Sequence, residues 1–141
     1  MNVLYTAEAV AVGEGRNGEI RSSDGVLDEL VAIPQEMGGP GGGTNPEQLF
    51  AAGYAACFNG ALRASARIAK IQIGVTEVTA KVGIGRVEGD AVGMHLTVDL
   101  VARVEGVEQS VADKLVHDAH QLCPYSNATR GNIEVAVTAT V

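Results

Sequence analysis

Two cysteines, Cys57 and Cys123, are the residues of this sequence best suited to chemistry. A thiolate is both a nucleophile and a redox group, whereas a protonated thiol is neither. The two residues form no Cys-x-x-Cys motif, but separation along the chain does not prevent contact in space. A reversible disulfide between Cys57 and Cys123 is therefore one possibility. The alternative is that Cys57 is a small buried hydrophobe, the commoner fate of a free cysteine on an apolar stripe.

A reactive Cys57 needs a source of positive charge. The residue lies roughly three turns into a predicted helix, beyond the first turn in which the helix dipole acts. Activation would therefore depend on a cation from another part of the chain. The candidates near loops or strand ends are Arg16, Arg21 and Arg130.

A metal site competes for Cys123. Asp113, His117, His120 and Cys123 follow one another at intervals of four, three and three, which would align them along one side of a helix. Such a stripe covers more than two turns, which is too long for one ion. We therefore favour the redox interpretation and expect no bound metal.

The helix that carries Cys57 is predicted over residues 45–70. Asn45 as N-cap would put Pro46 at the first helical position, whereas Thr44 as N-cap would form a capping box with Glu47. Small or apolar residues occupy so much of its circumference that we expect this helix to be buried and central. Two stripes carry them, the first being Phe50, Tyr54, Cys57, Ala61, Ala64 and Ile68, and the second Leu49, Gly53, Ala56 and Gly60.

The remaining predicted elements are six strands and one further helix. Residues 13–18 match G-x-G-x-x-G, but a strand pattern follows the glycines instead of a helix, so we predict a hairpin loop and no dinucleotide site. The whole chain, residues 1–141, is predicted to be a single domain. We predict strands over 3–12, 19–23, 26–34, 78–84, 94–100 and 132–141, a turn at 88–93 and a helix over 107–122 that Pro124 ends.

The composition narrows the possible partners. A net charge of −7 argues against nucleic acid and anionic membrane surfaces, both of which favour clustered Lys and Arg. The first twenty residues lack the basic start and apolar run of a secretory signal. We therefore expect a cytoplasmic protein, in which free cysteines stay reduced unless they act.

The segments around both cysteines resemble a known family. The stretch TNPEQLFAAGYAACF, which ends just after Cys57, and the stretch CPYSNATRGNI, which begins at Cys123, are similar to the two signature stretches of the organic hydroperoxide resistance proteins, the Ohr branch of the Ohr/OsmC family. The segments SSDGVL and KVGIG fit as well. The resemblance implies an α+β fold in which antiparallel β-sheets wrap around central helices in an intertwined homodimer.

The resemblance also implies a function, that of a thiol-dependent peroxidase. Cys57 would attack an organic hydroperoxide and become a sulfenic acid, and Cys123 would resolve it to a disulfide. A dithiol, typically the lipoyl group of a lipoylated protein, would reduce that disulfide, with no metal or flavin. The family's arginine and glutamate map to Arg16 and Glu47, where a bidentate pair would orient the guanidinium over the sulfur.

Apolar side chains near the predicted site would favour an apolar peroxide over hydrogen peroxide. These are Phe50, Leu49, Met37 and Tyr54, although Phe50 and Tyr54 could equally be ordinary core. Arg130 could bind a substrate or reductant group, or only the end of a helix or loop.

The spacing of Glu47 and Cys57 adds one geometric expectation. Ten residues separate them, which is about 15 Å along a straight helix, and they point in different directions. They could share a site only if the helix were broken near residues 45–53 or if the glutamate came from a second copy of the chain. Two rival functions stay open: an OsmC-type peroxidase with another peroxide preference, and a non-catalytic dimer that binds an apolar ligand or a metal.

Overall fold

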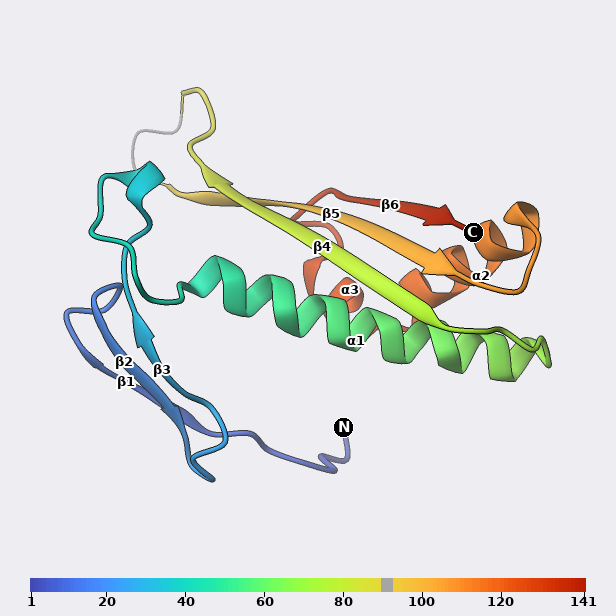
Figure 1. The fold of residues 1–141 in the computed structure, drawn as a ribbon, viewed down its shortest axis with the longest axis horizontal. Helices are drawn as coiled ribbons and strands as arrows, with labels where there is room; N and C mark the ends of the chain where they lie inside the picture. The colour runs from blue at the N-terminus through green and yellow to red at the C-terminus, as the bar shows by residue number, and fades with distance from the viewer. Residues whose placement is uncertain (90–92) are drawn as a thin grey trace. The chain divides into compact units, whose positions relative to one another are not determined.

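The computed structural model describes residues 1–89 and 93–141, which form two compact units, Met1–Leu49 and Phe50–Val141. Figure 1 labels the elements in chain order. They are β1 (Ala9–Gly13), β2 (Gly18–Ser22), β3 (Asp28–Val31), the 3-10 helix η1 (Gln35–Met37), α1 (Pro46–Ala69), β4 (Thr76–Gly85), β5 (His95–Val104), α2 (Gln109–Leu122), α3 (Pro124–Thr129) and β6 (Val135–Thr140).

The first unit contains an antiparallel sheet in the order β1-β2-β3. The three strands predicted over residues 3–12, 19–23 and 26–34 are thus confirmed, but the first and the third are shorter than predicted. The first begins at Ala9 because β2 offers pairing positions only to Ala9–Gly13, and the third ends at Val31, three residues before Pro34, which has no N–H to donate to a sheet.

The loop between β1 and β2 is the hairpin connection that the sequence predicts. Gly13 has a φ of 105°, a conformation that favours glycine. A Cβ on Gly18 would collide with the carbonyl oxygen of Val12. The glycines therefore allow the close pairing of β1 and β2, which explains the G-x-G-x-x-G match without a nucleotide-binding role.

Asn45 is the N-cap of α1. Its Oδ1 accepts a hydrogen bond from the backbone N–H of Gln48 at 2.9 Å, which leaves Pro46 at the first helical position. The helix then runs without interruption to Ala69, which confirms the predicted bounds to within one residue. The helix break proposed as one way to bring Glu47 to Cys57 is therefore wrong.

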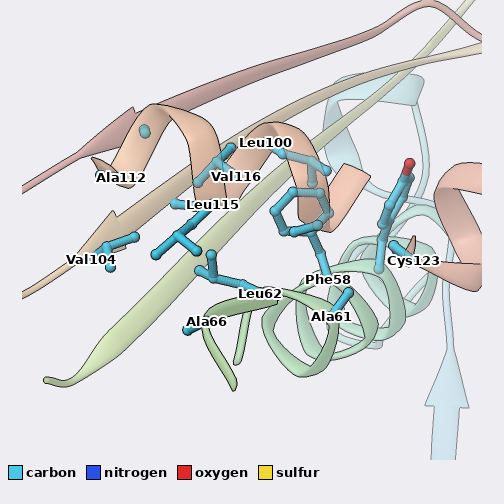
Figure 2. Close-up of a cluster of buried hydrophobic side chains, with 14 of the residues drawn as sticks. Phe58, Ala61, Leu62, Ala66, Leu100, Val104, Ala112, Leu115, Val116 and Cys123 are labelled. Carbon is cyan, nitrogen blue, oxygen red and sulfur yellow. The ribbon is translucent and has the colours of Figure 1, made fainter. Parts of the chain in front are cut away.

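The second unit packs helices against a sheet in the order β4-β5-β6 (Figure 1). The predicted hairpin is confirmed as β4 and β5, which are longer than predicted, and residues 90–92 of its turn at 88–93 lie outside the described residues. Alternate residues of β5 face the helices. Figure 2 shows part of the resulting core. Its largest buried apolar side chains are Tyr54, Phe58, Leu62, Leu100, Leu115, Val98 and Val104.

The prediction that α1 is buried around most of its circumference is only partly correct. Tyr54 and Ala61 of the first predicted stripe are buried, but Ile68 is 69% exposed. Ala56 and Gly60 of the second stripe are exposed too. Instead Phe58, Leu62 and Ala66 complete the buried side, so the helix has one face in the core of this chain.

Two further expectations are corrected at the end of the chain. The strand β6 pairs in parallel with β5, so this sheet is mixed and not antiparallel throughout. The reason is that α2 and α3 intervene and return the chain to the end where β5 begins. Pro124 does end α2, but it also occupies the first position of α3, where a missing N–H is harmless, and this short helix was not among the predicted elements.

Across the described ranges, 1–89 and 93–141, the structure contains no helix with the length and apolar content required to cross a membrane.

Candidate functional site

The fold of the second unit brings the two cysteines together. Cys57 projects from α1 and is half-buried, whereas Cys123 lies at the corner between α2 and α3 and is fully buried. Their sulfur atoms are 3.6 Å apart, and both thiols are free. Since a disulfide requires about 2.05 Å, an approach of only about 1.5 Å would join them. The pair is arranged for a reversible bridge.

The surroundings of Cys57 within this unit work against ionisation. Burial raises the pKa of the Cys57 thiol, and the neighbouring Cys123 thiol raises it further. A hydrogen bond from the backbone N–H of Tyr125 acts in the opposite direction but does not outweigh burial. A thiolate at Cys57 therefore requires an additional source of positive charge.

Tyr125 contributes to the site in two ways that the sequence did not predict. Besides its N–H contact with Cys57, its ring lies over Gly53, where a Cβ would stand 2.9 Å from the Tyr125 hydroxyl oxygen. The ring also contacts Phe50 and Tyr54, with centroid distances of 6.0 and 5.6 Å. The signal that could have indicated this role is its place two residues after Cys123, in the CPYSNATRGNI stretch.

The predicted apolar side chains are divided between the two units. Phe50 and Tyr54 belong to the second unit and are in edge-to-face contact at 5.9 Å. Tyr54 is fully buried, and its hydroxyl is hydrogen-bonded to side chains of α3, so it is part of the core. Leu49 and Met37 belong to the first unit, where Leu49 is half-buried and Met37, at the end of η1, is 42% exposed.

The first unit holds Arg16 and Glu47 in a bidentate ion pair. Arg16 Nη1 and Nη2 donate to the two Glu47 carboxylate oxygens, each at 2.8 Å. Glu47 stands in the first turn of α1, where the helix dipole favours a carboxylate. The hydrogen bonds with Arg16 hold the pKa of Glu47 below its usual value and raise that of Arg16. The guanidinium is therefore fixed in orientation and always charged.

The local fold explains how Arg16 reaches its partner. The arginine sits at the tip of the β1–β2 hairpin loop, next to Asn17, whose Oδ1 accepts a hydrogen bond from the Ile33 N–H at 3.2 Å. The chain then returns from β3 through the glycine-rich segment and meets Thr44 beside Val31. This connection sets the start of α1, and with it Glu47, near the loop.

The other candidate cations have different partners. Arg21 pairs with Asp28 across β2 and β3 at 3.3 Å, with both side chains more than half exposed. Arg130 donates to the His120 carbonyl at 2.8 Å and to Asn127 Oδ1 at 2.6 Å. Arg130 thus caps the end of α2, which agrees with one of the two alternatives given for this residue, that it binds the end of a helix or loop.

The structure does not gather the predicted metal ligands. His120 Nδ1 is hydrogen-bonded to Ser126 Oγ, Asp113 accepts from Gln109, and Cys123 faces Cys57. Among residues 1–89 and 93–141, no three side chains of His, Cys, Asp or Glu lie close enough to bind an ion. The metal interpretation of this helix face is therefore not supported.

Comparisons with known proteins agree on one family. The profile of the OsmC-like protein family matches residues 39–138. An organic hydroperoxide resistance protein of Xanthomonas axonopodis pv. citri is 52% identical over 138 residues, which cover 96% of this chain and 94% of that protein. The crystal structure of an organic hydroperoxide resistance protein from Elizabethkingia anophelis has 52% identity and a TM-score of 0.92, and covers 99% of both chains. A corresponding structure from Legionella pneumophila has 46% identity and a TM-score of 0.93, covering 99% of this chain and 100% of that one.

Proposed function

This chain belongs to the organic hydroperoxide resistance group of the OsmC/Ohr family, and we propose that it is a cysteine-based peroxidase that reduces organic hydroperoxides to alcohols. The observation that carries the proposal is the pair of free thiols 3.6 Å apart, one half-buried and one fully buried. The half-buried Cys57 can be approached by a substrate, whereas Cys123 is shielded from solvent and lies beside Cys57.

In the proposed reaction the Cys57 thiolate attacks the terminal oxygen of the hydroperoxide. The O–O bond breaks, the alcohol leaves after taking up a proton, and Cys57 becomes a sulfenic acid. The sulfur of Cys123 then attacks the sulfur of Cys57, which forms the disulfide and releases water. The separation of the sulfurs supports this second step, since only a small approach is needed.

Arg16 is proposed to stabilise the Cys57 thiolate, with Glu47 as the residue that positions it. The raised pKa of Cys57 supports a need for such a cation, and the bidentate pair supports a guanidinium held ready for it. Because α1 is unbroken between Glu47 and Cys57, we propose that the pair acts on the cysteine of a second copy of the chain.

An intertwined homodimer is part of the same proposal. In the first unit, one face of the three-stranded sheet exposes Val10, Val12 and Leu30, whose exposed fractions are 57%, 63% and 62%. Glu19, Arg21 and Asp28 lie on the same face beside them, and exposed apolar side chains rimmed by polar residues are typical of a surface that another chain covers. This arrangement supports the dimer.

The proposed substrate is an apolar hydroperoxide, with Phe50, Leu49 and Met37 as the apolar residues that would favour it, whereas the buried Tyr54 supports Phe50 from within the core. Phe50 lies on the same helix as Cys57, and its contacts with the rings of Tyr54 and Tyr125 support an apolar surface on this part of the second unit. The proposed reductant is the dihydrolipoyl group of a lipoylated protein, with no bound cofactor, and the proposed location is the cytoplasm.

The test compares consumption of cumene hydroperoxide and hydrogen peroxide with dihydrolipoamide, glutathione or thioredoxin as the donor. We expect turnover with the organic peroxide and dihydrolipoamide. Cys57→Ser should abolish it, and Cys123→Ser should permit one turnover and then stall unless a small thiol is added. Undiminished cycling by both variants would refute the mechanism, and equal rates with the two peroxides would refute the substrate class.

A further inference from the structure

A chain of buried hydrogen bonds lies beside the cysteine pair. The Tyr54 hydroxyl donates to Ser126 Oγ at 3.0 Å and also contacts Thr129 Oγ1 at 3.2 Å. His120 Nδ1 meets the same Ser126 oxygen at 2.9 Å. Tyr54 and Ser126 are both 0% exposed, so water does not compete for these bonds. The chain joins α1, α3 and α2.

The same three helices carry the two sulfurs. Cys57 follows Tyr54 by one turn on α1. Cys123 connects α2 to α3: its N–H donates to the Ala119 carbonyl, and its own carbonyl accepts from Asn127. The distance between the two sulfurs therefore depends on how α3 and the end of α2 are held against α1.

We propose that Tyr54, Ser126 and His120 are positioning residues that hold the sulfur of Cys123 close to that of Cys57 and so set how readily the disulfide closes. This inference rests on the proposed function for its role in catalysis, but the positioning itself does not depend on any peroxide. The hydroxyl of Ser126 is the central member, because it joins Tyr54 of α1 to His120 of α2 through α3.

The network has a consequence for the fate of the sulfenic acid. Cys57 sulfenic acid can be resolved by Cys123, which forms the S–S bond and releases water. It can instead be attacked by a second hydroperoxide, which yields the sulfinic acid and an alcohol. A network that keeps Cys123 close favours the first outcome, so its loss should increase overoxidation of Cys57.

The test measures the equilibrium between the dithiol and the disulfide in glutathione buffers, without peroxide. We expect Ser126→Ala to lower the effective concentration of the two thiols about tenfold, since a small misplacement of reacting groups has effects of this order or larger. That change would raise the reduction potential by about 30 mV. Tyr54→Phe should act in the same direction, and the double variant should show less than the sum of the two effects.

Ser65→Ala is the matched control. Ser65 is a buried serine of α1 whose hydroxyl donates to the Ala61 carbonyl at 3.1 Å, outside the network. Its loss should affect stability but leave the potential unchanged. In a second arm, Ser126→Ala treated with excess cumene hydroperoxide should accumulate more Cys57 sulfinic acid than the parent, by mass spectrometry.

An unchanged potential in both Ser126→Ala and Tyr54→Phe would overturn the positioning role, as would an equal shift in Ser65→Ala. Failure of the proposed function would look different. In that case the parent itself would form no sulfenic acid with organic peroxide, while the potentials of the variants would still differ from that of the parent.

Discussion

Replacing Arg16 with alanine tests the source of the Cys57 thiolate. Burial and the Cys123 thiol both raise the pKa of Cys57, and the Tyr125 N–H offsets only part of this. Without the guanidinium, the variant should therefore have a Cys57 pKa above the ordinary thiol value. We expect the pH profile of Cys57 alkylation to move upward in Arg16→Ala.

The magnitude follows from the charge that is removed. An opposite charge in close contact commonly changes a pKa by about 1–3 units, and one unit is a tenfold change in the ionisation constant. The bidentate pair with Glu47 keeps this charge in one orientation, so its effect should lie within that range. We therefore expect alkylation of Cys57 at pH 7 to slow about tenfold or more in Arg16→Ala.

The assay is iodoacetamide alkylation between pH 5 and 10, with Cys123→Ser as the background so that only Cys57 reacts. Arg21→Ala is the control, since it removes an arginine of the same unit whose partner is Asp28. Arg16→Lys should recover part of the effect, because it restores the charge but not the fork of donors. An Arg16→Ala profile that coincides with those of the parent and Arg21→Ala would remove Arg16 from the site.

Three further predictions concern stability and assembly. Leu62→Ala should lower the free energy of unfolding, measured in urea, by about 2–5 kcal/mol, because Leu62 is fully buried in the core. A loss well below this range would mean that neighbouring side chains move into the cavity and fill it. The pair of Arg16 and Glu47 should stabilise the fold at neutral pH by at most about 1 kcal/mol, because Arg16 is partly exposed. Because folding lowers the pKa of Glu47, this contribution is present above the ordinary carboxyl pKa and is lost as the pH falls through the pKa of the folded state. On acidification the parent should therefore lose more of its free energy of unfolding than Glu47→Gln does. Sedimentation should report a dimer, and a fully active monomer would exclude the shared site.

Local sequence signals predicted much of the fold. The helix around Cys57 was predicted to within one residue because Asn45, Pro46 and a long run of small and apolar residues act over a few positions. The β4–β5 hairpin was predicted because alternation with period two is a local property. The direction of β6 was not predicted, since pairing to β5 depends on how the intervening helices return the chain.

For the candidate site, the residue types identified which side chains could do the chemistry, and two long signature stretches identified the family to which the chain belongs. The distance of 3.6 Å between the sulfurs of Cys57 and Cys123, and the hydrogen bond of the Tyr125 N–H to Cys57, could be found only in the folded chain. The tertiary structure alone revealed the hydrogen bonds that link Tyr54, Ser126 and His120. These contacts join residues far apart in the chain, and the distances between such residues are set by helix packing and not by their neighbours in the sequence.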